Sequence, residues 1–177
     1  MIKDRMPPLA ADRMTPAQKK AAAELAAGPR GGVRGPFIPL LRSPDLMDRL
    51  QKVGEYLRYQ SSLETRLNEF LMLIVARQWA QQFEWFVHYP LALKAGLDRG
   101  VADAVADGRR PRGMAEDEEL AHDFCDELLR THGVSDATLP QRGRQIPRAG
   151  RDRHAGSDRL FHYGLDGDER GSHAAAG

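Results

Sequence analysis

The sequence predicts an all-α fold, and three features support this assignment. Apolar residues recur at helical spacing between residues 46 and 57 and again between 116 and 131, as on the buried face of a helix. Residue pairs that favour helix starts precede several of the expected helices. No segment of useful length alternates apolar and polar residues, which is the pattern of a half-buried strand.

The first two helices are marked by their starting residues. After a polar lead at 1–14, which we expect to be mobile, Thr15 is a good N-cap and Pro16 suits the first helical position. This helix should end at Gly28. Ser43 opens a second helix, whose apolar positions keep the helical period: Leu46, Met47, Leu50, Val53 and Leu57.

A glycine-rich segment, RGGVRGPF at 30–37, separates these two helices. Its glycines predict a loop rather than a regular element. The backbone of this loop either approaches a ligand closely or is a plain connection with solvated arginines.

The segment 63–96 is the centre of the sequence, since it holds the longest apolar run and both tryptophans. We expect Ser61 and Glu64 to form a capping box before it. Pro90 should end or kink its last helix, because proline lacks the backbone donor that a helix interior needs.

This central segment is too long for one helix. An uninterrupted helix from 61 to 89 would be about 43 Å long, which exceeds what a compact domain of this size accommodates. We therefore expect a break between residues 78 and 82, although no glycine or proline marks it.

Two further helices complete the expected domain. Residues 101–106 form a short helix closed by Gly108, and 116–131 form the most amphipathic helix, with acids in its first turn. Cys125 lies on the apolar face of that helix, where core packing is a better explanation than reactivity. Ser135 is a candidate cap for one more helix.

The composition changes after about residue 139. Residues 15–139 therefore form the helical domain, and 140–177 form an Arg-, Gly- and His-rich tail that buries too little apolar surface to offset its ordering entropy, so we expect disorder. A shifted reading frame in GC-rich DNA would also produce such a composition. Resequencing the gene would test that hypothesis.

Polar side chains within the central segment are the candidate functional residues. Gln81, Glu84 and His88 stand at i, i+3 and i+7 and share one stripe of a helix. On an unbroken helix Glu69 would point about 120° away from this stripe, whereas a break near residue 80 can turn it back toward His88. The plainer interpretation stays open, in which His88 is a core histidine and Glu84 is its i, i+4 partner.

The order and spacing of these residues resemble the carboxymuconolactone decarboxylase-like family, which includes the alkylhydroperoxidase D enzymes. The peroxidase branch of that family carries a Glu, two Cys in a CxxC and a His, at steps of 12, 3 and 4 residues. The corresponding positions here are Glu69, Gln81, Glu84 and His88.

The resemblance extends beyond this motif. The segments 30–37 and LLRSP at 40–44 are similar to the entry segment of decarboxylase-like members, and the match in order covers roughly residues 15 to 138. It implies an alkylhydroperoxidase D-like helical domain.

The resemblance also implies a function. The chain would be a cofactor-free lyase of aromatic-compound catabolism that decarboxylates a small carboxylated lactone or a related acid. His88 would donate the proton to carbon, and Glu69 or Glu84 would fix its tautomer. The candidate substrate-binding residues are Gln81, Arg77, Arg34 and Trp85, with an arginine binding the carboxylate and Trp79, Trp85 and Phe86 keeping water out.

Other chemistries have less support in the sequence. Gln81 and Glu84 stand where the family has redox cysteines, so we do not expect a cysteine peroxidase. Glu84 and His88 are two candidate metal ligands without a third, and we expect neither a metal nor a cofactor. No GxSxG motif and no phosphate-binding loop are present. The alternative is a non-catalytic or stress-associated relative whose polar pocket is structural.

Composition limits the partners of the protein. A net charge of +1 with 29% charged residues is not that of a nucleic-acid binder, and the longest apolar run is far short of the roughly 20 residues that span a bilayer. Without a signal-like segment, we expect a cytoplasmic protein. The apolar helices at 63–96 and 116–131 have more apolar surface than one small domain covers, and the resemblance implies a homo-oligomer, a trimer or hexamer.

Overall fold

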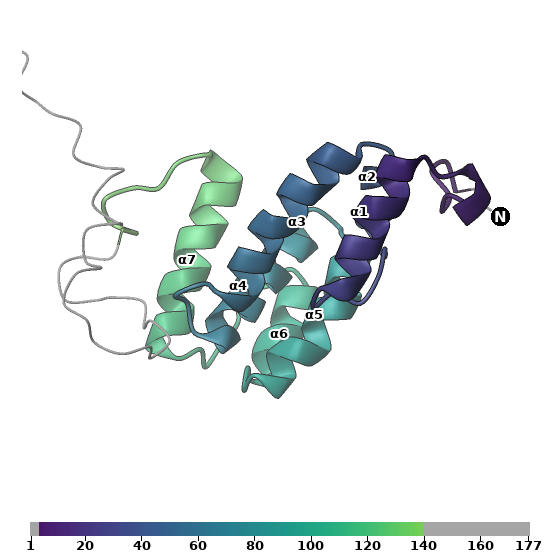
Figure 1. Cartoon of the computed structure of the whole chain (residues 1–177). Helices are drawn as coiled ribbons and strands as arrows, with labels where there is room; N and C mark the ends of the chain where they lie inside the picture. Colours follow the sequence, from purple (N-terminus) through teal and green to yellow (C-terminus); the bar gives the residue numbers. More distant parts are fainter. Residues whose placement is uncertain (1–3, 140–177) are drawn as a thin grey trace, which may run out of the picture.

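The computed structural model describes residues 4–139, and all regular secondary structure in that range is helical, which confirms the expected fold class (Figure 1). The elements in chain order are a short 3-10 helix (Ala11–Arg13), α1 (Pro16–Ala27), α2 (Phe37–Leu40), α3 (Pro44–Tyr59), α4 (Thr65–Gln78), α5 (Gln82–Lys94), α6 (Arg99–Ala106) and α7 (Glu116–Thr131). None of the described helices is long and apolar enough to cross a membrane. The predictions for the tail at 140–177 lie outside the described residues.

The helices form two groups, each with its own apolar cluster. Helix α4 packs against α5, α6 and α7, and Figure 1 shows it between α7 on one side and α5 with α6 on the other. The larger cluster lies among these four helices, and the smaller one lies among α1, α2 and α3. The buried side chains at their centres include Phe70, Leu73, Ala92 and Val101 in the larger cluster and Leu25, Leu41 and Met47 in the smaller one.

The start of α1 follows the prediction. The Thr15 side chain accepts a hydrogen bond from the Gln18 backbone N–H at 3.3 Å, and the Gln18 side chain accepts one from the Thr15 N–H at 2.9 Å. Residues before this helix make more contacts with the rest of the domain than we expected of a mobile segment. Leu9 and Met14 pack against the smaller cluster, and Arg42 donates a hydrogen bond to the Pro7 carbonyl at 2.8 Å.

The expected capping box at Ser61 is wrong. The Ser61 hydroxyl accepts a hydrogen bond from the backbone N–H of Leu63, only two residues ahead, at 3.1 Å. This local turn competes with helical capping, so α4 begins at Thr65, with Glu64 as an N-cap that makes no side-chain cap bond. A serine followed three residues later by a glutamate forms a capping box only where the helix begins at the residue after the serine, and here it begins four residues after it.

The expected break in the central segment is confirmed: α4 ends at Gln78 and α5 begins at Gln82. The termination is a Schellman motif, in which Gln81 N–H donates to the Ala76 carbonyl at 2.8 Å and Ala80 N–H donates to the Arg77 carbonyl at 3.2 Å. Ala80 takes the left-handed conformation, with φ of 51°. Helices α5 and α6 end in the same bonding pattern, but with glycines, Gly96 and Gly108, at the left-handed position.

Pro90 does not end α5, which continues to Lys94. The backbone bond that Pro90 cannot make would have reached the carbonyl of Phe86. Both residues are exposed, so water can satisfy that carbonyl. Burial of Ala92 keeps the last turn of the helix against the larger cluster.

The last two helices lie close to their predicted positions. Asp98 caps α6 by accepting hydrogen bonds from the N–H groups of Gly100 and Val101, and α7 has the predicted bounds of 116–131. A further helix after Ser135 is not formed within the described residues, because this serine bonds Glu127 of α7 instead.

Candidate active site

A buried carboxylate–imidazole pair joins α4 to α5. His88 Nδ1 lies 2.6 Å from Glu69 Oε2, and both residues are only 5% exposed. The Ala80 turn brings them together, because it reverses the chain between the helix that carries Glu69 and the one that carries His88. Two buried polar groups thus satisfy each other, which buried polar side chains require.

The second nitrogen of the same imidazole faces another carboxylate. His88 Nε2 lies 3.4 Å from Glu84 Oε2, one helical turn earlier on α5. This distance is long for a hydrogen bond, so the contact is looser than the one between Nδ1 and Glu69. The Glu84 side chain is 39% exposed, so the line Glu69–His88–Glu84 runs from the core toward solvent.

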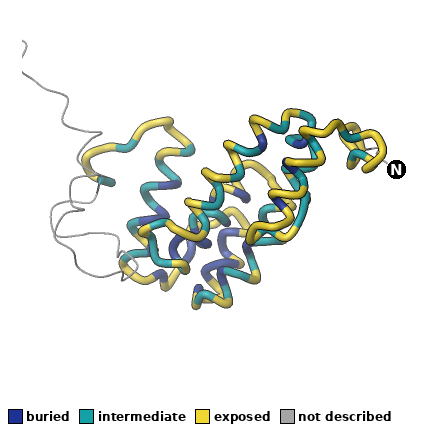
Figure 2. The backbone as a smooth tube through the Cα atoms, in the orientation of Figure 1, coloured by how far each residue is buried: buried dark blue, intermediate teal, exposed yellow. Residues whose placement is uncertain are grey.

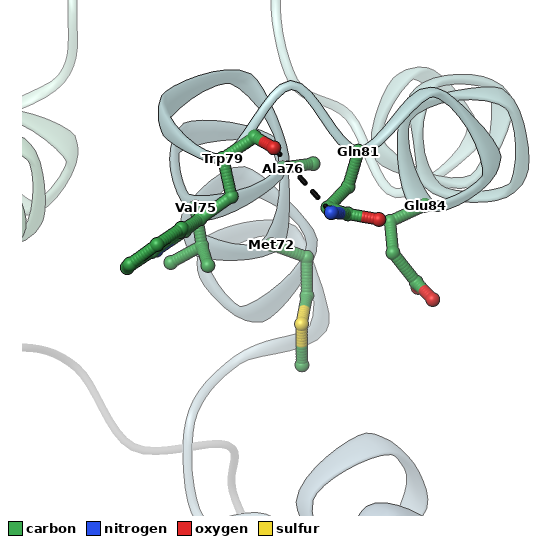
Figure 3. Close-up of a pocket in the computed structure, with 6 residues that line it drawn as sticks. All are labelled: Met72, Val75, Ala76, Trp79, Gln81 and Glu84. Carbon is green, nitrogen blue, oxygen red and sulfur yellow. Dashed lines mark hydrogen bonds between the residues drawn. The ribbon is translucent and has the colours of Figure 1, made fainter. Parts of the chain in front are cut away.

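The line ends at a pocket between α4 and α5, lined by Met72, Val75, Ala76, Trp79, Gln81 and Glu84, with a volume of about 270 Å³. In Figure 3 the side chains of Met72 and Glu84 extend in the same direction from the two helices. Gln81 lies between them, and its amide donates to the Trp79 carbonyl at 3.4 Å. Most of the wall is apolar, and among the residues that the structure describes Glu84 is its only ionisable lining residue.

His88 itself does not line this pocket. The group that a bound molecule would touch is therefore Glu84, and His88 stands behind it. From the sequence we expected His88 to make the direct contact, because helical spacing places both side chains on one stripe without showing which is deeper.

The other candidate substrate-binding residues lie apart from the pocket wall. Arg77 directs its Nε to the Ala106 carbonyl at 2.7 Å, which ties α4 to α6. Trp85 packs against the larger cluster, with its ring 5.7 Å from that of Tyr89. Arg34 is exposed and lies in the loop before α2.

The expected exclusion of water by three aromatic residues is wrong for two of them. Trp79 is 66% exposed and Phe86 is 78% exposed, so neither shields the imidazole. Phe86 lies two residues before His88, which places it on the opposite face of α5. The helical arithmetic that grouped Glu84 with His88 already excludes Phe86 from their stripe.

The loop at 30–37 reaches the same end of α5. Gly35 has φ of +53°, and a Cβ atom at its position would lie only 2.2 Å from the nearest ring atom of Phe83. Any other residue at this position would force the Phe83 ring to move, in addition to adopting a backbone conformation that favours glycine. This contact brings the backbone next to Arg34 close to Phe83, the residue that precedes Glu84.

Three pocket residues on α4, Met72, Val75 and Ala76, were missed in the sequence. Met72, Val75, Ala76 and Trp79 stand at i, i+3, i+4 and i+7, so they share one face of the helix. That spacing was available, but it is also the spacing of a core face. Only the observed exposure of Val75 and Trp79 distinguishes a pocket wall from packed core.

The single cysteine lies away from this pocket, on α7. Burial, with a smaller contribution from the Asp126 carboxylate, raises the pKa of the Cys125 thiol to about 11. Its packing in the larger cluster confirms the predicted core role. Among residues 4–139 no group of three or more His, Cys, Asp or Glu side chains is arranged to hold a metal ion.

Comparison of the chain with protein-family models, curated proteins and solved structures gave no match.

Proposed function

We propose that this protein is a cofactor-free acid–base enzyme that acts on a small molecule bound between α4 and α5. The observation that carries the proposal is the line Glu69–His88–Glu84, which connects a buried carboxylate to an ionisable group that lines the pocket. A chain of groups that can exchange protons, ending at a cavity, is the arrangement that general acid–base catalysis needs.

Each group has a distinct role in this proposal. Glu84 is the catalytic residue, because it is the member of the line that touches bound substrate. His88 is a positioning and relay residue that returns a proton to Glu84 through Nε2. Glu69 holds Nδ1 at 2.6 Å and so fixes the tautomer that presents Nε2 to Glu84.

The reaction class that we propose is decarboxylation of a lactone acid or a related acid, as the resemblance to the carboxymuconolactone decarboxylase-like family suggests. The bond between carbon and the carboxylate breaks, carbon dioxide leaves, and the electron pair stays behind as a dienolate. Protonated Glu84 then delivers its proton to carbon. His88 returns a proton to Glu84 from Nε2 in its doubly protonated form, while Nδ1–H stays bonded to Glu69, and Nε2 then takes up a replacement proton that comes from solvent.

Such a substrate needs a cation to bind its carboxylate. Arg77 is engaged with the Ala106 carbonyl, and among residues 4–139 no cationic side chain lines the pocket. We assign this role to Arg34, since its neighbour Gly35 packs on Phe83 beside Glu84. Closure of this loop over a ligand would bring the guanidinium to the mouth of the pocket.

A decarboxylase assay with a panel of lactone and β-keto acids tests the proposal. Glu84→Gln should lower turnover by roughly 10²- to 10⁴-fold while the fold is retained. Arg34→Gln should mainly raise KM, whereas Arg77→Gln, the matched control, should leave KM unchanged. Absence of turnover with every acid, together with no ligand-induced rise in melting temperature, would refute the proposal.

A second candidate function is a non-catalytic relative with a structural polar pocket. The exposure of Trp79 and Phe86 favours it, because water reaches the Glu84 side of the line. A ligand that stabilises the fold without being converted would support this candidate. At 100 times its dissociation constant such a ligand should add about 2.7 kcal/mol of stability.

A further inference from the structure

Within residues 4–139, helix α3 presents to solvent an apolar face that no other element covers, although its spacing predicted a buried face. Its exposed large side chains include Leu46, Leu50, Val53 and Leu57, which we call the α3 seam. The seam is distinct from the packed face of α3, where Met47 is buried in the smaller cluster. Figure 2 shows exposed residues along much of this helix.

The spacing of the seam is that of a helix–helix interface. Its residues follow one another at steps of 4, 3 and 4, which is the alternation of a and d positions in a coiled coil. In the part of the chain that the structure describes, these four side chains are exposed to solvent, Val53 to 56% and each of the others to more than 40%. A sustained apolar stripe of this kind, left open on a folded chain, indicates an interaction site.

The seam is complementary to itself when a second copy is antiparallel. About a twofold axis between residues 51 and 52, Leu46 faces Leu57 of the second copy and Leu50 faces Val53 of the second copy. Every apolar position is then matched by another, as in the alternating layers of an antiparallel helix pair. A closed twofold interface requires this self-complementarity.

The charges of α3 favour the same orientation. The first turn of the helix is acidic at Asp45, and the last turn is basic at Arg58. Antiparallel packing places the acidic turn of one copy near the basic turn of the other and opposes the two helix dipoles. Parallel packing would instead bring the Asp45 side chains of the two copies together, and likewise the two Arg58 side chains, so that like charges would be neighbours.

The charged residues in the middle of α3 do not obstruct this packing. Lys52 is neutralised within its own helix by Asp48, at 2.7 Å. Arg49 borders the seam and, in the antiparallel arrangement, lies near Tyr56 of the second copy, which is an exposed aromatic ring. A guanidinium over an aromatic face is a favourable contact.

We infer that α3 is the docking site for a second copy of this chain and that the protein forms a twofold homodimer through antiparallel α3 helices. The seam runs along a helix of 16 residues, about 24 Å, so the interface is small and the dimer is expected to dissociate in the micromolar range. This inference does not depend on the proposed catalytic function.

Sedimentation velocity of the full chain across the micromolar range is the first test. The wild type should shift from monomer to dimer with concentration, and Leu50→Glu should raise the dissociation constant by roughly 100-fold or more, because a carboxylate would be buried in the seam. Leu128→Glu is the matched control, since Leu128 on α7 is 42% exposed against 44% for Leu50. It should leave the dissociation constant unchanged. A wild type that stays monomeric, a trimer, or a dimer insensitive to Leu50→Glu would overturn the inference.

Disulfide crosslinking tests the orientation. In a Cys125→Ser background, chains carrying Leu50→Cys and chains carrying Val53→Cys are mixed under mild oxidation. Antiparallel packing predicts that the mixed pair crosslinks faster than either variant with itself, because disulfides form only between closely opposed β-carbons. Preferential crosslinking of Leu50→Cys to itself would indicate parallel helices and would overturn the proposed arrangement.

Discussion

At the scale of single residues, the most consequential pair is Glu69 with His88. Both side chains are buried, and they satisfy each other across two helices. His88→Gln removes the imidazole from Glu69, so this variant should lower the free energy of unfolding by about 1–3 kcal/mol. Glu84→Gln, on the exposed side of the same imidazole, should change it by less than about 0.5 kcal/mol. Urea denaturation of both variants measures these differences.

The same pair of variants separates catalytic from structural roles. In the proposed enzyme Glu84→Gln loses turnover at nearly unchanged stability, and His88→Gln loses both. Full turnover in His88→Gln, combined with a lowered midpoint of unfolding, would limit this histidine to a structural role. Equal destabilisation by the two variants would contradict the depth that the structure assigns to each group.

Cys125 is the second residue with a sharp expectation. Since burial raises its pKa to about 11, little thiolate exists near neutral pH, and alkylation of the native chain should be slow. The free energy of unfolding should fall as pH rises from the ordinary value of 9.0 toward 11, because the unfolded thiol releases its proton first. Thiol titration with and without urea checks the reactivity. Rapid native labelling, or peroxide consumption lost in Cys125→Ser, would contradict it.

At the scale of elements, the turn at Ala80 decides the geometry of the site. Helices α5 and α6 place glycine at the left-handed position of their Schellman motifs, whereas α4 places alanine there. Ala80→Gly removes this strain and should stabilise the fold by about 0.5–1 kcal/mol. Ala95→Gly is the matched control, since its φ is −77°. It should destabilise by a similar amount, as followed by thermal melting. A destabilised Ala80→Gly would show that the turn is not strained.

The sequence predicted most elements, and its failures have physical causes. Helix starts with local side-chain caps, such as Thr15, were predictable because the stabilising bond lies within four residues. The break at Ala80 was predictable from helix length alone, since no glycine marks it. Ser61 misled the prediction because its hydroxyl serves a turn before the helix instead of the helix.

The candidate site was predictable to a similar extent. Helical spacing placed Glu84 and His88 on one face, and the expected break allowed Glu69 to join them, as the structure confirms. Relative depth was not predictable, because it depends on which helices pack against that face. The exposure of Trp79 and Phe86 was unpredictable for the same reason, since aromatic character alone does not decide whether a side chain is buried.

At the scale of the whole molecule, the two apolar clusters differ in size. Seven residues of α4 are buried in the described chain, against two of α1. Backbone amides of α4 should therefore exchange with solvent roughly 10- to 1000-fold more slowly than those of α1, because local opening near the smaller cluster exposes less apolar surface. Hydrogen exchange, measured where the chain is monomeric, tests this difference. Uniform protection of the two helices would mean that the domain opens only as one unit.

The two tryptophans of the chain occupy contrasting environments. Trp79 lines the pocket and is largely exposed, whereas Trp85 packs against Tyr89 and the larger cluster. The unmodified protein thus carries two optical probes, one for occupancy of the pocket and one for integrity of the core. Ligand binding should alter the emission of Trp79 and unfolding that of Trp85. The variant Trp79→Phe should abolish the first fluorescence change and preserve the second.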